Sequence, residues 1–591
     1  MIAGTRHGEK PSSERKDGHR LKAKGRSVRL IGTILTYSIP AVFLVLFCLY
    51  PLALMARYGV VDDSGRFTFD YLKDVFQDRI LRKVIGFTVA QAFISALVTV
   101  ILAFPGAYLL ARYKFFGRSM IMAASTVPFV LPSLVLAVGF LGLFGAQGTL
   151  NGWVHDINSS LGTSVPTIDI LYTKRVIILA HVFFNFPIAL RILNSRFASM
   201  DPTLERAARS MGAGRIRTFL QITLPQMRYS ILSSFSLVFT FCLLSLGVIL
   251  VVGGLNHTLE VELFSLFTDL KLHHGSALFI IEAIIVMGAT GIYLWSSSRE
   301  GGRAEVALGE GVSRRGGKRP GPAPFLLIIV YAILVILVIF GPLLVVMQES
   351  ITSSGSSGGF TLDHYGTVLS RQEDPMLSIS PLGAIVNSLL FGSLTMLISV
   401  PLALLTAHIM VRRKFIGKGF LDMLLLFPLG ASSIALGYGL IKAYSTGPLQ
   451  LTGTWYIVVM VHSVIAYPLG ARAIYSSMRA VPCDLMRAAR SLGASPLEAY
   501  FKVKLPLIMP GILVAAVFSF AISLGELGAT LMVSKEAYMT MPVFLYRMIE
   551  GGGREIGPMN AFAVILILIT FLSFLGIELG RKAFMRWGVD R

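Results

Sequence analysis

The first candidates for chemistry in this 591-residue chain are ionisable side chains placed inside long apolar runs. Glu526 stands in the stretch SLGELGAT, and Glu282 lies about one helical turn inside another apolar run. His181 and His462 occupy equivalent places in two further runs. A charge inside a membrane span is costly unless it faces a cavity or a partner, so each residue is a candidate for a solute path. The position in the first half of the chain that aligns with Glu526 is Ser245.

Each of these candidates has a structural alternative. Glu282 can instead extend to the outer membrane interface, and the two histidines can instead make packing hydrogen bonds. Glu526 is the best candidate for a path residue, because the flanking glycines allow close helix approach or a local bend. A lone carboxylate in a low-dielectric funnel attracts a cation, although a role in helix packing remains open.

The motifs of an ATPase or a metalloenzyme are missing from the sequence. There is no G-x-x-x-x-G-K-[ST] stretch to hold the phosphates of ATP, so a partner chain must hydrolyse ATP if any is used. No cysteine or histidine pair has the spacing of a zinc site, and the three cysteines do not suggest a disulfide framework. We therefore expect a protein that is not an enzyme by itself and that needs no cofactor or metal.

The elements that position these residues are predicted to be membrane helices. Only 14% of the residues are charged, compared with about 25% in soluble domains. A spanning helix needs about 20 mostly apolar residues. The sequence predicts twelve such helices, near 30–56, 85–111, 119–145, 174–197, 229–253, 277–297, 323–348, 383–411, 420–443, 454–476, 509–533 and 560–580.

The location of the positive charge predicts the orientation. The net charge is +21, with nine Lys or Arg in residues 1–29 and most others in short gaps between apolar runs. If the N-terminus is cytoplasmic, the basic gaps fall on the inner side, as the positive-inside rule requires. We expect both termini in the cytoplasm and a chain that resides in the bilayer of a bacterial inner membrane. The basic tail is interpreted as a topology signal, and no nucleic-acid partner is expected.

The chain is also a duplication. HVFFNFP at 181–187 recurs as HSVIAYP at 462–468, and RAARSMGAGRIRTFLQITLP at 206–225 recurs as RAARSLGASPLEAYFKVKLP at 487–506, both displaced by 281 positions. Six predicted crossings separate the copies, so the repeats are parallel. The predicted units are a basic tail (1–29), a first six-span half (30–297), a cytoplasmic linker (298–322), a second six-span half (323–580) and a tail (581–591).

The segment repeated at 206–225 and 487–506 has the pattern of two short helices around a glycine. Ser495 followed by Pro and, three residues on, Glu498 is typical of a helix start. Gly212 and Gly493 suit the left-handed conformation at a helix end. We expect each second helix to end at Pro225 or Pro506, before the next span. Small alanines on the first helix would let a partner approach closely.

These segments resemble the cytoplasmic loop of permease subunits in binding-protein-dependent ABC importers, whose signature is Glu-Ala-Ala, three residues, Gly and a distal Leu-Pro. In this sequence Arg206 and Arg487 replace the family's Glu, and Glu205 is adjacent in the first copy. The substitution puts any salt bridge of the family's Glu in doubt, but not the docking. The matching positions are Ala207, Ala208, Gly212, Leu224 and Pro225, then Ala488, Ala489, Gly493, Leu505 and Pro506.

The resemblance implies an all-α membrane protein of twelve helices in two parallel six-helix, MetI-like repeats. It also implies two ATP-binding cassette ATPase subunits on the inner face and a periplasmic substrate-binding protein outside. Fused two-copy members of the family import ferric iron or thiamine, and stretches such as 523–549 are most similar to the thiamine (and thiamine pyrophosphate) permeases. The alternatives are a ferric-iron permease and, from another class, an ion-coupled secondary transporter with six-plus-six parallel repeats.

Overall fold

The computed structural model describes residues 38–125, 131–146, 148–300, 319–353, 359–372, 378–412, 427–551 and 556–589. The predicted basic tail, most of the predicted linker and parts of the first, third and ninth predicted spans lie outside these residues. Apart from two isolated β-bridges, the regular structure of the described chain is helical. The prediction of an all-α membrane protein agrees with this architecture.

Ten helical stretches of the described chain are long and apolar enough to cross a membrane. Six of them match predicted spans of the first and second halves closely, and the others differ at their ends. The principal helices of these stretches are α2 (Tyr50–Tyr58), α4 (Arg79–Arg112), α7 (Ser133–Phe144) with α8 (Thr149–Leu161), α9 (Lys174–Ser199), α15 (Leu272–Arg299), α17 (Pro322–Glu349), α19 (Pro381–Arg412), α22 (Trp455–Ala480), α25 (Leu505–Gly525) and α28 (Ile556–Val589).

The prediction of twelve continuous spans is not confirmed. In place of the span predicted at 229–253, the structure has α12 (Leu224–Leu243), an irregular segment and then α13 (Gly247–Val252). Four serines, Gln226 and Arg228 interrupt the apolar residues of α12, which is not among the ten stretches. Of the span predicted at 420–443, the described part is a 3-10 turn, η3 (Phe427–Gly430), followed by α21 (Ser433–Tyr444). Helices broken by irregular backbone defeat a count that is based on apolar length alone.

The duplication is visible in three dimensions. The backbone N–H of Leu259, which begins α14 (Leu259–Thr268), donates to Thr88 Oγ1 of α4 at 2.9 Å. At the matching place in the second half, the N–H of Met541, which begins α27 (Met541–Glu550), donates to Ser388 Oγ of α19 at 2.7 Å. The same hydrogen bond therefore fixes the same corner of each half.

The two halves are interlocked through their first spans. Helix α2 of the first half packs on α21 of the second half, and α17 of the second half packs on α7 of the first half. Glycines allow both contacts: a Cβ on Gly439 would lie 2.8 Å from the carbonyl oxygen of Pro51, and one on Gly139 would lie 2.8 Å from that of Pro342. Such close backbone approach through small residues is typical of membrane helices.

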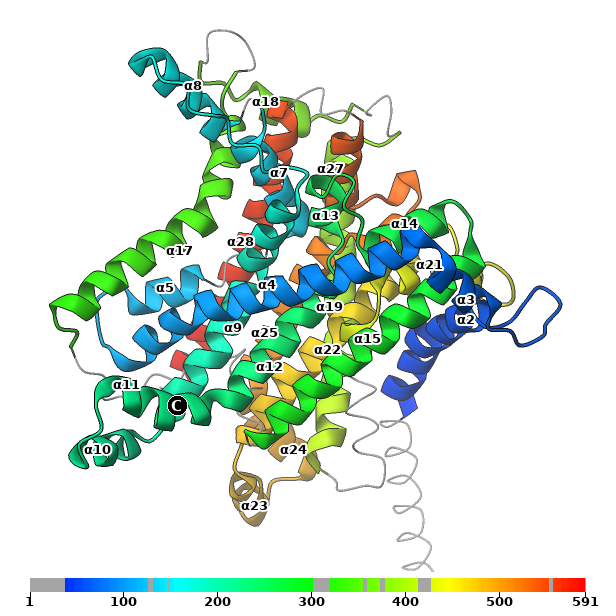
Figure 1. Cartoon of the computed structure of the whole chain (residues 1–591). Helices are drawn as coiled ribbons and strands as arrows, with labels where there is room; N and C mark the ends of the chain where they lie inside the picture. Colours follow the sequence, from blue (N-terminus) through cyan, green and yellow to red (C-terminus); the bar gives the residue numbers. More distant parts are fainter. Residues whose placement is uncertain are drawn as a thin grey trace, which may run out of the picture.

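The ends of the bundle carry different elements. The short helices α10 (Pro202–Ser210) and α23 (Cys483–Ser491), which contain the repeated segments, lie together at the lower end in Figure 1. Helices α8 and α18 (Asp363–Val368) lie at the upper end. Both repeated segments therefore project from the same side of the protein, as parallel repeats require.

Candidate functional site

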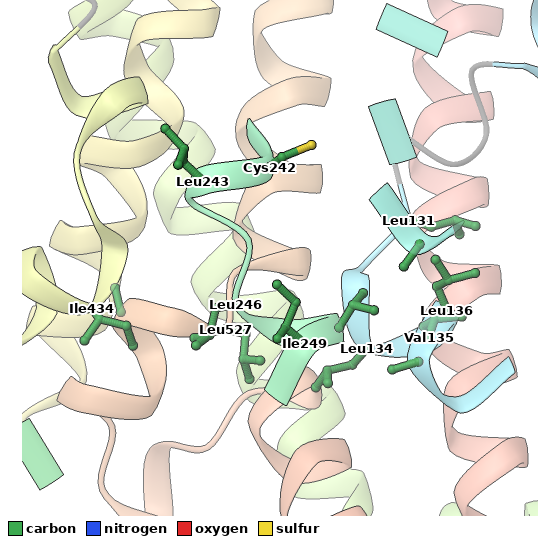
Figure 2. Packing of buried hydrophobic residues seen from close by; sticks show 14 of the residues in the cluster. Leu131, Leu134, Val135, Leu136, Cys242, Leu243, Leu246, Ile249, Ile434 and Leu527 are labelled. Atoms are coloured by element: carbon green, nitrogen blue, oxygen red, sulfur yellow. The ribbon is translucent and has the colours of Figure 1, made fainter. Parts of the chain in front are cut away.

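The fifth span of each half is broken at an equivalent leucine. Helix α12 ends at Leu243 and α13 begins at Gly247, while α25 ends at Gly525 and α26 (Gly528–Val533) begins three residues later. A Cβ on Gly247 would lie 3.2 Å from Leu527 Cδ2, and one on Gly528 would lie 3.3 Å from Leu246 Cδ2. Leu246 and Leu527 thus meet between the halves, where Figure 2 shows them side by side.

A cavity of about 340 Å³ lies beside these breaks and is lined by both halves. The first half contributes residues of α7, α9 and the end of α12, and the second half contributes the end of α25 and Glu526. Three phenylalanines, Phe184, Phe241 and Phe518, form part of its wall. A largely apolar concavity with a few polar groups is the usual form of a small-molecule site.

Glu526 is the carboxylate of this cavity, and its oxygens are held by the start of α26. They accept hydrogen bonds from the backbone N–H groups of Ala529 at 2.9 Å and Thr530 at 3.0 Å, and from Thr530 Oγ1 at 2.6 Å. The side chain satisfies backbone donors at the N-terminal end of α26 and is only 8% exposed. The structure therefore places Glu526 both in the cavity wall, as the path interpretation requires, and in helix packing.

The two equivalent histidines have different surroundings. His462 Nδ1 lies 2.7 Å from Ser523 Oγ, its Nε2 lies 2.7 Å from Thr530 Oγ1, and Nε2 is 3.7 Å from Glu526 Oε2. His181 Nδ1 lies 3.2 Å from Ser95 Oγ, and within the described residues its Nε2 has no partner. His462 is thus a packing histidine, as its structural alternative predicted, whereas His181 is also part of the cavity lining.

The remaining two sequence candidates are separated by the fold. Ser245 lies at the break after α12 and lines the cavity with Glu526. Glu282 is buried in α15, only 1% exposed, and is not among the cavity-lining residues. Its burial does not fit a side chain that extends to the membrane interface.

The repeated loops have the local geometry that the sequence predicts. Asp201 accepts a hydrogen bond from the N–H of Thr203 at 2.9 Å, and Ser495 forms a reciprocal capping box with Glu498. Gly212 has φ +88° and Gly493 has φ +90°. Both glycines therefore adopt the left-handed conformation that ends the first short helix.

The expectation that each second helix ends at Pro225 or Pro506 is wrong. Helix α11 (Arg215–Thr218) continues through a π-helical turn, η2 (Phe219–Thr223), directly into α12, in which Pro225 is the second residue. Helix α24 (Pro496–Ala499) continues in the same way through η4 (Tyr500–Lys504) into α25. Proline lacks an N–H group, which is not needed in the first turn of a helix. Here each proline is the second residue of α12 or α25 and follows a π-helical turn. Each loop is thus joined rigidly to a spanning helix.

A feature that the sequence interpretation missed is a set of exposed large apolar side chains on both loops. Eight of them are between 43% and 89% exposed. They form four pairs separated by 281 positions, so the same four places are apolar and exposed in each copy. The signal was present in the repeat alignment, but the alignment alone does not show exposure. The pairs are Leu204 and Leu485, Met211 and Leu492, Ile216 and Leu497, and Leu220 and Phe501.

The small residues of the loops take two orientations. Ala207 and Ala488 are exposed, whereas Ala208 is buried and Ala489 is half-buried. Exposed arginines flank the two exposed alanines, among them Arg206 and Arg487. The outward face of each loop is thus apolar with a basic border.

The first loop has an anchor that the second lacks. Glu205 is buried and accepts from Arg112 Nη1 at 2.9 Å, from the other terminal nitrogen of that guanidinium, and from Thr223 Oγ1 at 2.9 Å. The Arg112 hydrogen bonds hold the pKa of Glu205 below its usual range, against the opposing effect of burial. The corresponding residues of the second loop are Met486 and Lys504. Glu205 therefore binds the loop to α4 and does not face outward.

In the described part of the chain, no three His, Cys, Asp or Glu side chains gather to hold an ion. The geometry instead suggests a non-covalent path between two halves and a pair of docking loops.

Comparison with known proteins identifies a family that matches this chain and several similar proteins. The family model of the binding-protein-dependent transport system inner membrane component matches residues 100–350 and 399–580. The thiamine transport system permease protein ThiP of Escherichia coli (strain K12) is 26% identical over 514 residues, which are 85% of this chain and 90% of that protein. The ferric transport system permease protein FbpB of Actinobacillus pleuropneumoniae is 24% identical over 470 residues, 78% of this chain and 65% of that protein.

Among solved structures, a crystal structure of a bacterial alginate ABC transporter in complex with an alginate pentasaccharide-bound periplasmic protein is similar to part of the chain. The likeness covers 47% of this chain and 95% of that one, with 16% sequence identity and a TM-score of 0.38.

Proposed function

Because the chain belongs to the family of binding-protein-dependent transport system inner membrane components, we propose that the cavity between its halves is the import path for a small organic cation. As a member of this family it is a multi-pass inner-membrane permease of a binding-protein-dependent ABC importer, and it is not itself an enzyme. The predicted boundaries of the two halves, 30–297 and 323–580, and the cytoplasmic position of both termini belong to the same proposal.

The observation that carries the proposal is the pair of matched loops. Four exposed apolar positions recur at the same places in both, on one side of the molecule, and water-exposed apolar side chains that repeat in this way favour burial against a partner. We infer two partners of the same kind, because the two surfaces match. Two ATPase subunits, one on each loop, satisfy this requirement.

Coupling from such subunits to the path has a direct route. Each loop continues without interruption into a spanning helix, α12 or α25, and each of these helices ends at the break that contains Leu246 or Leu527. Movement of the loops would therefore be transmitted to the contact between these leucines. In the proposed cycle the halves move as units, and the path opens in turn to the periplasmic binding protein and to the cytoplasm.

The cavity wall favours an organic cation over a bare metal ion. Among the described residues, its lining includes three phenylalanines and a single acidic side chain, that of Glu526. Aromatic faces and a carboxylate attract an organic cation, whereas a ferric ion needs several hard oxygen or nitrogen ligands at once. Thiamine or thiamine pyrophosphate is the substrate that we favour, in agreement with the thiamine transport system to which ThiP belongs, and the resemblance to FbpB keeps ferric iron as the second candidate.

Reconstitution tests the proposal. The full chain is placed in liposomes with its ATPase and binding protein, which are identified by the genes beside its own, and labelled thiamine and ferric iron are offered separately. We expect ATP-dependent uptake of thiamine and stimulation of the ATPase by the loaded binding protein. Uptake driven by an ion gradient without ATP would instead identify a secondary transporter. ATP-dependent uptake of iron alone would retain the importer and replace the substrate.

A further inference from the structure

Two buried carboxylates outside the cavity lining have oxygens with no partner in the described chain. Glu282 of α15 is 1% exposed, and neither of its oxygens is hydrogen-bonded. Glu260, in the first turn of α14, is 0% exposed; its Oε2 accepts from Ser432 Oγ at 3.0 Å, while its Oε1 has no partner. Buried carboxylates normally have hydrogen bonds or an opposite charge, so these three oxygens need an explanation.

Helices α14 and α15, which carry the two carboxylates, and α21, which begins after Ser432, meet in an aromatic layer. Phe267 of α14 stacks on Tyr438 of α21, with ring centroids 4.6 Å apart and an interplanar angle of 6°. Gly275 of α15 lies against the same ring, since a Cβ there would be 2.5 Å from Phe267 Cε1. Helices α14 and α15 belong to the first half and α21 to the second, so this layer lies on a seam between the halves.

Helical periodicity places both carboxylates two turns below this layer. Seven residues make about two turns, which returns a side chain to the same face of a helix. Along α14 the step from Phe267 leads to Glu260, and along the antiparallel α15 the step from Gly275 leads to Glu282. On α21, the same seven-residue step back from Tyr438 leads to the N-terminal end of the helix, next to its capping residue Ser432.

A second contact fixes Glu282 at this level. One turn further along α15, Val286 Cγ1 would lie 3.2 Å from a Cβ on Gly430, which is two residues before Ser432. The carboxylates of Glu282 and Glu260 therefore both face the N-terminal end of α21. Ser432 Oγ accepts from the N–H of Ala435 at 3.2 Å, so its own proton is free to bond Glu260.

No positive side chain neutralises the pair within the described residues, where no ion pair includes either carboxylate. Other titratable groups on the packed helices are engaged elsewhere or lie at helix ends. Glu526 and His462 belong to the hydrogen-bond network of α26, Glu262 lies 3.1 Å from His257, and Lys442 lies over the Tyr438 ring near the end of α21. Helix α3 (Asp70–Gln77) and the first turn of α4 also carry charged residues, but these lie before the long apolar part of α4.

We propose that Glu260 and Glu282, with Ser432, form a buried cation site on this seam, which holds one positive charge as a proton or as an alkali-metal ion. Carboxylate and hydroxyl oxygens are suitable ligands for a hard cation, and a shared proton would satisfy the same oxygens without requiring space. The cation joins α14 and α15 of the first half to α21 of the second. Its binding therefore stabilises the contact between the halves.

The opposite seam provides an internal comparison, because its described residues differ at two of the three places. When the starts of α27 and α14 and the starts of α7 and α21 are matched, Pro542 stands in the place of Glu260 and Pro132 in the place of Ser432. Neither proline side chain can bind a cation. The site is thus a property of one seam, and a bound cation would make the two seams unequal in strength.

The test is the thermal stability of the purified full-length chain in lipid nanodiscs. Sodium or potassium chloride replaces choline chloride at constant ionic strength and neutral pH, and a second series without alkali metals varies the pH from mildly acidic to mildly alkaline. The variants are Glu282→Gln and Glu260→Gln, which keep the side-chain shape. The matched control is Glu536→Gln, an exposed carboxylate outside the seam.

A melting temperature that rises with sodium or potassium in the wild type and the control, but not in the two variants, identifies a metal ion. A melting temperature that ignores these salts but falls as pH rises, again only where both carboxylates are present, identifies a proton. The proposal is overturned if the wild type shows neither dependence, an outcome that does not require the variants to fold. It is also overturned if folded Glu282→Gln and Glu260→Gln keep the dependence of the wild type.

Discussion

The two halves of the protein share a frame and differ in what they attach to it. The corner hydrogen bonds at Thr88 and Ser388 and the left-handed glycines of the two loops repeat with nearly the same geometry. At the cavity, however, Cys242 and Ile249 of the first half occupy the places of Ser523 and Thr530 in the second. The helices are thus placed alike in both halves, whereas the hydrogen bonds of His462 to Ser523 and Thr530 have no equivalent at the matching places of the first half.

The same contrast holds for the loops. Their outward faces are apolar at four matching positions, but their inward faces differ. The first loop is bound to α4 by Arg112, Glu205 and Thr223, whereas the second has Met486 and Lys504 at the last two of these places. The exposed apolar positions are therefore duplicated, and the contacts that hold the first loop in place are not.

The largest effect is expected where the halves agree most. The double variant Gly212→Val, Gly493→Val forces β-branched residues into left-handed backbone at +88° and +90°, at a cost of roughly 1–2 kcal/mol per site. Among the described residues, no atom beyond those of the adjacent residues in the chain lies within 4 Å of a Cβ at either position, so the strain is in the backbone and not from a clash. We expect loss of ATP-driven uptake with normal membrane insertion, measured by transport and by protein level in membranes.

The matched control is Gly212→Asn, Gly493→Asn, because asparagine tolerates the left-handed region. This variant should retain most of the uptake. Full uptake by the valine pair would show that the break between the short helices does not orient them.

The second prediction uses the largest chemical difference between the halves. Glu526→Gln removes the cavity carboxylate and should lower uptake of a cationic substrate about tenfold at limiting concentration, or ~1.4 kcal/mol. Expression should be unchanged, and the ATPase should still respond to the binding protein. Ser245→Ala, at the aligned position, is the control and should transport normally. Wild-type uptake by Glu526→Gln would leave this residue with a packing role only.

The third prediction makes the two loops alike. Glu205→Met gives the first loop the residue of the second and leaves Arg112 without its partner. Because the Arg112 side chain is 33% exposed, we expect a loss of only about 1–2 kcal/mol, seen as faster proteolysis of the first loop. Met486→Leu in the second loop is the control. Equal proteolysis of the wild type and Glu205→Met would mean that the ion pair does not hold the loop.

Acid should have the same effect on the wild-type loop. The Glu205 pKa is lowered in the folded protein, so the stabilisation is present above the ordinary carboxyl pKa and is lost as pH falls through the lowered value. The first loop should accordingly keep its protease resistance at neutral pH and lose it only in acid, and Glu205→Met should remove this dependence.

The smallest predicted difference separates the two histidines. His462→Leu removes two contacts of 2.7 Å, whereas His181→Leu removes one of 3.2 Å. We expect the first variant to be less stable than the second by ~1 kcal/mol, measured by thermal unfolding in nanodiscs. The reverse order would contradict the assignment of His462 as the structural histidine.

Much of this arrangement could be predicted from the sequence because duplication makes it visible. Repetition at 281 positions identified the loops, and glycine and capping chemistry predicted the glycine break and the start of α24 correctly, but not the continuation of each loop into α12 or α25. Counting spans failed because irregular backbone between protein helices is not marked by apolar length: the breaks before Gly247 and Gly528 lie inside apolar runs. The exposure of Met211 and the anchoring of Glu205 depend on tertiary contacts, which a sequence pattern does not show.

The central claim is that both loops dock on ATPase subunits, and cysteine crosslinking tests it most directly. Ala207 and Ala488 are exposed and stand at matching places, so each is changed to cysteine after the three native cysteines, Cys48, Cys242 and Cys483, have been replaced. The complex is crosslinked with a short bifunctional reagent in nucleotide-free, ATP-bound and ADP-bound states. We predict that each cysteine joins the chain to an ATPase subunit and that the two together capture two subunits. Failure of both to crosslink in every nucleotide state would contradict the account.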